Sequence, residues 1–211
     1  MKSLAVILVL LSFEILFAQG EYIDRGQNAY GIGLSAGLHP KIIAMGGSAA
    51  ISNSGTFDFG ISYTYLFSQE QNLTDKSTST AVTPFAGVHI LKQSGTNPIS
   101  VSAMLQYQVH RLTSIDGNNQ ASLGSWAIGA SVFRRFEISQ KFHFQPLAAI
   151  SFIRPEKYPG EPVPNMVPAF QVSAAFISMM AETSKIILKP SASFSSEETF
   201  YSLSFEFVDL L

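Results

Sequence analysis

Few side chains in this sequence could carry acid–base, nucleophilic or metal chemistry. Its 211 residues include 4 His and no Cys, which excludes disulfides, thiolate metal sites and a Cys nucleophile. One grouping has the residue types of a hydrolase, because His110 precedes Ser114 and Asp116. A nucleophilic mechanism needs these groups within hydrogen-bonding distance, which closeness in sequence does not ensure. We interpret His110 as a solvated residue near a strand end, and we expect no catalytic residue, no metal ligand and no enzymatic activity.

A second set of ionisable residues is predicted to lie inside the protein, on the polar side of alternating strands. Its members are Asp58, His89, Arg135, His143, Lys189 and Glu206. An isolated charge in a low-dielectric interior costs several kcal/mol, so we expect these groups to form salt bridges that hold the interior closed. A sharper hypothesis is a proton-sensitive gate, because His89 and His143 would titrate near neutral pH.

Cofactor and nucleic-acid binding find no support in the sequence. Gly31, Gly33 and Ala36 superficially match a dinucleotide-binding fingerprint, but that motif needs a helix after it, and no helical pattern follows. The formal net charge is −2, only 13% of the residues are charged, and no basic stripe is present that could follow a phosphate backbone. We therefore expect no cofactor and no nucleic-acid partner.

The elements that must position these residues are strands, because side-chain character alternates with a period of two. In residues 56–67, for example, Phe57, Phe59 and Ile61 alternate with polar or small residues. The same pattern predicts about ten strands of a length suited to crossing a bilayer at a tilt. The expected spans are 29–38, 42–52, 55–67, 80–91, 98–112, 122–138, 141–154, 167–179, 185–195 and 199–208. Pro84, Pro146 and Pro190 lie inside three of them and should disturb pairing.

Short turns and long loops alternate between the predicted strands, as an up-and-down antiparallel barrel requires. The sequence therefore predicts an all-β transmembrane barrel of about ten strands, with eight to twelve possible. Residues 1–18 have the basic start, apolar core and small-residue end of a cleaved signal peptide, and 19–211 form the barrel domain. Both termini and the tight turns should then face the periplasm.

The polar side of the strands decides which face is outside. It is mostly Ser, Gly, Ala and Gln, which fit inside a narrow barrel, while aromatic residues gather towards the strand ends. In this pattern the chain resembles bacterial outer-membrane β-barrels of the porin-like class, without matching one particular family. The alternating aromatic end, Tyr201 to Phe207, is similar to the signal that the barrel assembly machinery reads. The resemblance implies a Gram-negative outer membrane, with its lipids and that machinery as partners.

Three functions are consistent with such a barrel. The first is a small passive pore or a membrane-embedded structural protein, with small residues such as Ala44, Gly46 and Ser48 leaving a slot along one wall. The second is a binding or assembly component that acts through external loops. Its candidate residues lie in one proline-rich loop: Pro155, Tyr158, Pro159, Pro162 and Pro164. The third is a secreted soluble lipid-binding barrel with its two faces reversed.

Overall fold

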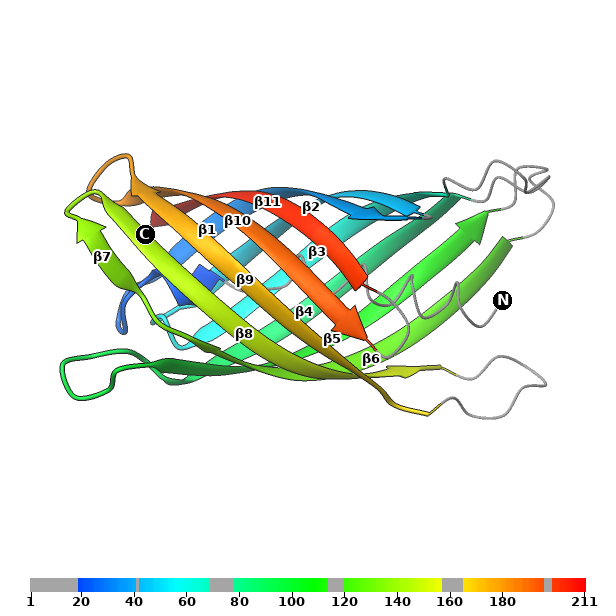
Figure 1. Cartoon of the computed structure of the whole chain (residues 1–211), viewed down its shortest axis with the longest axis horizontal. Helices are drawn as coiled ribbons and strands as arrows, with labels where there is room; N and C mark the ends of the chain where they lie inside the picture. The colour runs from blue at the N-terminus through cyan, green and yellow to red at the C-terminus, as the bar shows by residue number, and fades with distance from the viewer. Residues whose placement is uncertain (1–18, 41, 69–77, 114–119, 157–164, 196–198) are drawn as a thin grey trace.

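The described residues form one β-sheet and one short helix. The structure, a computed structural model, describes residues 19–40, 42–68, 78–113, 120–156, 165–195 and 199–211 (Figure 1). The elements are η2 (Gln19–Tyr22), β1 (Ala29–His39), β2 (Ile42–Asn53), β3 (Phe57–Ser68), β4 (Thr78–Leu91), β5 (Ser100–Thr113), β6 (Gln120–Phe133), β7 (Phe136–Ser139), β8 (Phe142–Pro155), β9 (Val167–Met179), β10 (Ser184–Ser195) and β11 (Thr199–Leu210). Within these residues no helix is long and apolar enough to cross a bilayer.

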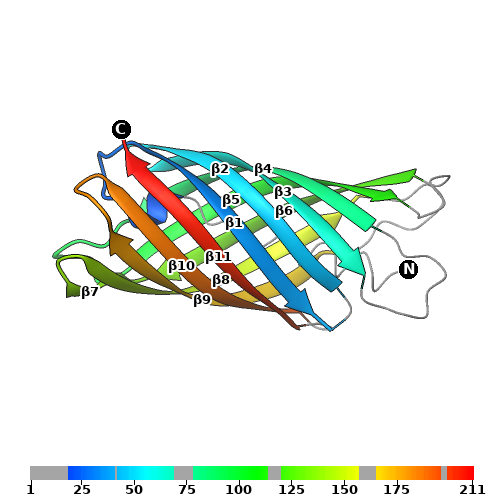
Figure 2. The same ribbon diagram turned by 90° about the horizontal axis from the view of Figure 1, so that it is seen from above.

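The sheet closes on itself as an antiparallel barrel. From β1 to β6 and from β7 to β11 each strand pairs with its neighbours in sequence, β1 pairs with β11, and β6 pairs with β8. The short β7 also pairs with β8, so β6 and β7 are two parts of one wall strand and the barrel has ten strands. Tilted strands run around the whole circumference in both views (Figures 1 and 2). The predicted ten-stranded up-and-down barrel is confirmed.

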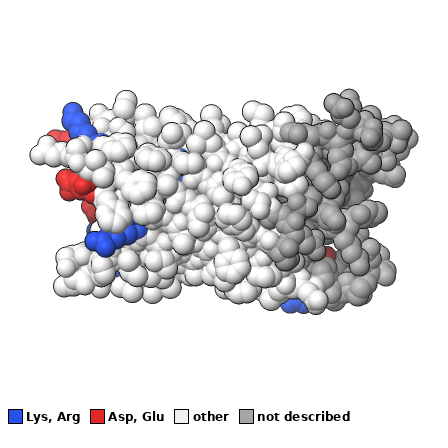
Figure 3. Space-filling view, viewed as in Figure 1, with Lys and Arg blue, Asp and Glu red and all other residues white. Residues whose placement is uncertain are grey.

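The two faces of the wall follow the alternation in the sequence. Apolar side chains such as Ile32, Leu34 and Phe59 are more than half exposed on the outside, while Ser, Thr and Gln side chains of the same strands are buried inside. Outward aromatics contact one another near both ends: Phe142 and Phe144 each pack on Phe176, and Tyr107 packs on Trp126 at 4.5 Å between ring centroids. Charged side chains lie near the ends, with an uncharged belt between (Figure 3).

The three prolines inside strands interrupt the sheet only locally. Around Pro84 the β4–β5 register has no pairs between Val82 and Phe85, and around Pro190 the β10–β9 register has none between Leu188 and Ser191. The β6–β8 register ends at Leu147, next to Pro146. Each proline still has a partner on its other side: Ile61 for Pro84, Ala174 for Pro146 and Leu203 for Pro190. A proline lacks the N–H for one ladder bond only, so the strand continues without a bulge.

The lumen contains large side chains at the positions where the wall residues are small. A Cβ at Gly37 would collide with the ring of Phe200, and one at Gly60 would collide with the ring of Phe85. Phe200 also packs with Ile42, Ala44 and Leu66 into an apolar cluster on the inside of the wall. Phe200 therefore fills the space beside Ala44, while Gly46 and Ser48 of the expected slot are partly exposed.

Tight turns lie at the same end of the barrel as both Ala29 and the C-terminus; we call it the tight-turn end (Figure 2). Between β2 and β3, Ser54 and Gly55 have φ values of 54° and 55°, a left-handed pair that matches the twist of a hairpin. The chain before β1 packs against this turn, since a Cβ at Gly55 would collide with the carbonyl oxygen of Asp24. The turn therefore holds the entering chain close to the barrel mouth.

Candidate functional site

The main feature that sequence reasoning missed is a segment of the chain inside the barrel. Residues 19–28, which we call the N-terminal segment, enter the lumen at the tight-turn end. The short helix η2 lies inside the barrel, surrounded by its strands (Figure 2). Tyr22 is 0% exposed and Ile23 is 1% exposed. Together with Ala29, Val208 and three residues of β9 and β10 (Ala175, Ile177 and Ile187) they form an apolar cluster. This end of the lumen is thus occupied by the protein itself.

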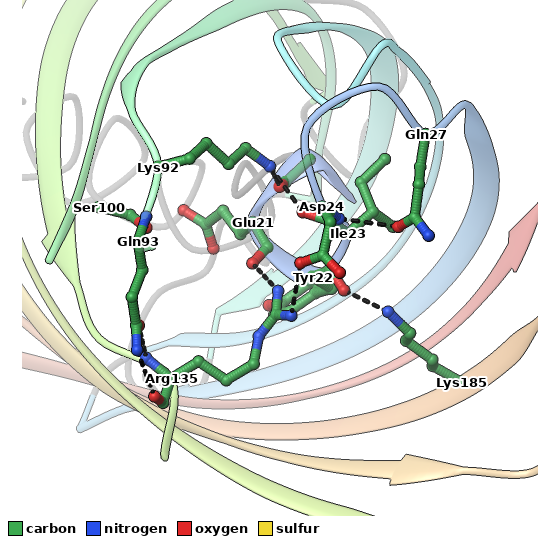
Figure 4. Close-up of polar contacts among 11 residues, drawn as sticks. Glu21, Tyr22, Ile23, Asp24, Gln27, Lys92, Gln93, Ser100, Arg135 and Lys185 are labelled. Carbon is green, nitrogen blue, oxygen red and sulfur yellow. Dashed lines mark hydrogen bonds and ion pairs between the residues drawn. The ribbon is translucent and has the colours of Figure 1, made fainter. Parts of the chain in front are cut away.

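Three cationic side chains from different parts of the wall hold this segment by its backbone (Figure 4). Lys92 donates to the carbonyl oxygens of Gly20 and Ile23, the latter at 2.7 Å. Arg135 donates from Nη2 to the carbonyl oxygen of Glu21 at 2.9 Å, and Lys185 donates to that of Tyr22 at 2.5 Å. Four consecutive carbonyls therefore have charged donors, and such bonds are about twice as strong as neutral ones.

Arg135 is itself fixed by the neighbouring β4–β5 connection. Its backbone N donates to Oε1 of Gln93 at 2.7 Å, and Nε2 of Gln93 donates to its carbonyl oxygen at 2.9 Å. Its guanidinium also pairs with Asp24, 3.3 Å from Nη1 to Oδ1. The break between β6 and β7 places this side chain at the mouth, where it points to the N-terminal segment (Figure 4).

Two pairs of ionisable side chains lie deeper in the lumen. Asp58 is 2.5 Å from Nε2 of His89, and its other oxygen accepts the backbone N–H of Gly20 at 3.1 Å. Lys189 is 3.1 Å from a carboxylate oxygen of Glu206. The structure therefore brings together four of the six residues predicted for the interior as two pairs from different strands, and Asp58 also fixes the N-terminal segment.

The other two predicted interior residues lie at the mouth. Arg135 pairs with Asp24 of the N-terminal segment rather than with Asp58 or Glu206. His143 is half-buried and lines a cavity at the tight-turn end together with Glu137 and Gln145. The six residues thus form two inner pairs and an outer group, because the register of β8 places His143 near the hairpin that begins it.

Glu21 is the unusual group of the N-terminal segment. Its carboxyl is 2% exposed, and neither oxygen has a hydrogen-bond partner within the described part of the chain. Burial raises the pKa of Glu21 to about 8, and the negative charges of Glu206 and Asp58 act in the same direction, against Lys189 and Lys92. Burial also lowers the pKa of Lys92 to about 8. Glu21 is therefore mostly neutral at pH 7 while it stays in the lumen.

One sequence expectation about possible chemistry is wrong, and two others fall on residues that are not described. His110 is 0% exposed on the inward face of β5, because the closed wall surrounds it, whereas a solvated residue near a strand end was expected. Its candidate partners Ser114 and Asp116 lie outside the described residues. In the proline-rich loop Pro155 is the last residue of β8. Tyr158, Pro159, Pro162 and Pro164 lie outside the described residues.

A signal for the N-terminal segment was present in the sequence. Lys92, Arg135 and Lys185 all fall at predicted tight turns or beside them, and no equal number of acids stands near them. Tyr22 and Ile23 are apolar residues in a stretch that the strand pattern leaves unassigned. Apolar residues outside the strands, together with cations at the turns, are consistent with an N-terminal segment that binds inside the barrel. The periodic pattern of the strands does not indicate where such a short segment binds.

Comparison with known proteins identifies the fold and no family. No protein-family model matches the chain, and no curated protein matches its sequence. Three solved structures are similar over nearly their whole length. The first is the beta domain of the Bordetella autotransporter BrkA, with a TM-score of 0.53 and 10% identity over 88% of this chain and 99% of that one.

The second is the translocator domain of the autotransporter NalP from Neisseria meningitidis, with a TM-score of 0.52 and 9% identity over 99% of this chain and 94% of that one. The third is the transport unit of the autotransporter AIDA-I from Escherichia coli, with a TM-score of 0.52 and 10% identity over 99% and 97%. At these identities the likeness concerns the fold alone. The closed barrel, its apolar outer face and these neighbours define the class: the chain is an outer-membrane β-barrel protein.

Proposed function

We propose that this protein is a closed barrel of the bacterial outer membrane that acts as an embedded structural protein and does not conduct at rest. The observation that carries the proposal is the N-terminal segment, which lies inside the lumen at the tight-turn end and is held there by Lys92, Arg135 and Lys185. A passive pore would need a continuous polar path. Strong backbone docking of a segment in that path favours closure instead.

Apolar side chains on the inside of the wall support the same proposal. Phe200 packs with Leu66 and Ile42 near the end opposite the tight turns, and Phe133 packs with Leu147 at the tight-turn end. Ten strands enclose an interior that side chains can largely fill, much narrower than that of a large porin. Water and ions would therefore meet inward apolar side chains near the opposite end in addition to the N-terminal segment.

The expected surroundings follow from the outer face and the strand ends. We propose that outer-membrane lipids cover the uncharged belt, that the tight-turn end faces the periplasm, and that the barrel assembly machinery recognises β11. We also propose that residues 1–18 are a cleaved signal peptide. No enzymatic activity is proposed, because His110 is buried away from any aqueous substrate.

Planar-bilayer recording of the purified, refolded protein tests closure. We expect no steady current, because the N-terminal segment and inward apolar side chains obstruct the lumen. Heat-modifiable gel mobility of the same sample serves as the control for folding. Steady ohmic steps from the folded protein would overturn the proposal in favour of a passive pore.

Cysteine labelling tests whether the N-terminal segment is docked in the membrane. The chain has no native Cys, so a single introduced thiol reports alone. We expect Ile23→Cys, at a position 1% exposed, to react with a maleimide at least tenfold more slowly than Arg25→Cys, which stands two residues away and is exposed. Equal rates in folded protein would mean that the segment does not occupy the lumen.

A further inference from the structure

A cavity of about 390 Å³ opens at the tight-turn end between the N-terminal segment and the wall. We call it the vestibule; among the residues that line it are Glu21, Lys92, Arg135, Glu137, His143 and Gln145. Cavities that hold small molecules in proteins start at about 300 Å³. The vestibule is therefore large enough for a small solute or for the headgroup of a lipid.

Several hydrogen-bond donors around the vestibule have no acceptor. Nε of Arg135 is buried and has no partner within the described residues. Gln145 is 1% exposed, and neither atom of its amide group has a partner there. Lys92 uses two donors of its ammonium group on the carbonyls of Gly20 and Ile23 and has a third. A buried polar group without a partner is costly. These donors favour a ligand that has acceptors, while the Glu21 carboxyl and Oε1 of Gln145, which also lack partners among the described residues, favour one that carries a donor as well.

Two cations, Lys92 and Arg135, and three carboxyl groups, those of Glu21, Asp24 and Glu137, line the vestibule. Lys92 has its hydrogen bonds with neutral carbonyl oxygens, and Arg135 has one carboxylate partner, Asp24, which is 76% exposed on its side chain. Glu137 is exposed at the rim. Glu21 contributes little negative charge near pH 7, because burial raises its pKa to about 8. An anion would therefore give Lys92 a charged partner, which the two backbone carbonyls that it binds do not supply.

We propose that the vestibule binds an oxyanion group, phosphate or carboxylate, with Lys92 and Arg135 as the charged partners and the Gln145 amide as a further donor. Charge-assisted bonds from a lysine and an arginine are the contacts by which proteins hold such groups. The group can belong to a free solute of the periplasm or to the headgroup of an anionic phospholipid in the inner leaflet. This site does not depend on whether the barrel conducts.

Calorimetric titration with two probes tests the site. Refolded protein in an uncharged detergent is titrated with sodium phosphate against sodium chloride of equal ionic strength, and separately with mixed micelles that contain phosphatidylglycerol or only phosphatidylcholine. We expect one saturable site per chain for phosphate, phosphatidylglycerol or both. Binding of phosphate identifies a solute site, and binding of phosphatidylglycerol alone identifies a headgroup site.

Variants then place the site in the vestibule. We expect Lys92→Gln to weaken binding at least tenfold, and Gln145→Leu, which leaves the cations and the N-terminal contacts unchanged, to weaken it about fivefold. Lys141→Gln, at an exposed turn outside the vestibule, should bind as the unaltered protein does. All variants are checked for heat-modifiable mobility. The proposal is wrong if neither probe binds, or if folded Lys92→Gln and Gln145→Leu both retain the affinity of the unaltered protein.

Discussion

At the scale of single residues, a buried ion pair makes this barrel sensitive to the loss of one partner. The side chain of Lys189 is 1% exposed and that of Glu206 is 8% exposed. Because water scarcely reaches either group, each charge is stabilised largely by the opposite charge of the other. Removing one member of a buried pair costs about 3–5 kcal/mol, whereas replacing both by apolar residues is often neutral. The stability of the fold therefore suffers most when one member of the pair is removed and the other stays buried.

We expect Glu206→Gln to lower the free energy of unfolding in urea by about 3 kcal/mol, because it leaves the Lys189 ammonium buried without its carboxylate. The double variant Lys189→Met with Glu206→Leu should recover most of that loss. Glu137→Gln, at an exposed position, is the matched control and should change little. Equal stability of Glu206→Gln and the control would mean that the pair carries no net stabilisation.

The N-terminal segment should respond to pH through Glu21 and Lys92. Glu21 has an ordinary pKa of 4.5 and one of about 8 when docked, so below pH 4.5 its carboxyl is neutral in both states and does not oppose docking. As the pH rises from 4.5 to 8, ionisation favours the released segment and docking weakens. Lys92 has an ordinary pKa of 10.5 and one of about 8 when docked, because burial disfavours its charged form. The cost of burying this charge opposes docking below pH 8 and disappears by pH 10.5, where the amine is neutral in both states. Docking should therefore be weakest near pH 8.

The labelling rate of Ile23→Cys, divided by that of Arg25→Cys at each pH, measures this dependence. We expect the ratio to rise between pH 5 and pH 8, because transient release exposes Ile23→Cys. Adding Glu21→Gln should flatten the ratio over this range, since the amide cannot ionise. A ratio that rises equally in the Glu21→Gln background would exclude Glu21 as the titrating group.

At the scale of elements, the strands fit around inward side chains that come from other strands. Gly37 in β1 lies under the ring of Phe200 in β11, and Gly60 in β3 lies under the ring of Phe85 in β4. Gly47 in β2 has only ordinary contacts around the position of a Cβ, the nearest at 3.5 Å. Glycines of similar sequence context therefore differ in what a methyl group would meet.

We expect Gly37→Ala to lower the free energy of unfolding by about 1–3 kcal/mol, because the new methyl group must displace the Phe200 ring. Gly47→Ala, on the neighbouring strand, should be neutral or slightly stabilising. Urea unfolding of both variants in the same vesicles gives the comparison. If Gly37→Ala is as stable as Gly47→Ala, the cluster around Phe200 is looser than the structure indicates.

At the scale of the whole molecule, one tryptophan reports how the barrel meets its surroundings. Trp126 lies on the outer face, opposite Arg154 near the end of β8, and is 47% exposed. We expect its fluorescence to be quenched by brominated phospholipids, most strongly when the bromines lie near the headgroups, because aromatic rings favour that depth. Iodide in the water should quench it weakly. Strong iodide quenching without bromine quenching would contradict a bilayer around this face.

The strand pattern of the sequence determined the wall of this protein. Alternation of side chains predicted ten strands, their order and their outer face, because period-two patterning fixes both the element and the side it presents. Even Pro84 and Pro190 are compatible with the pattern, since each loses only one ladder bond. These features depend on neighbours in sequence, so the sequence contained them.

Only the tertiary structure decided what fills the lumen. The pairing of Asp58 with His89, the cluster around Phe200 and the docking of the N-terminal segment all join residues from separate strands. No local period encodes such contacts, because they depend on how the barrel closes and on which inward side chains then meet. His110 shows the same limit, since its burial follows from the closed wall around it.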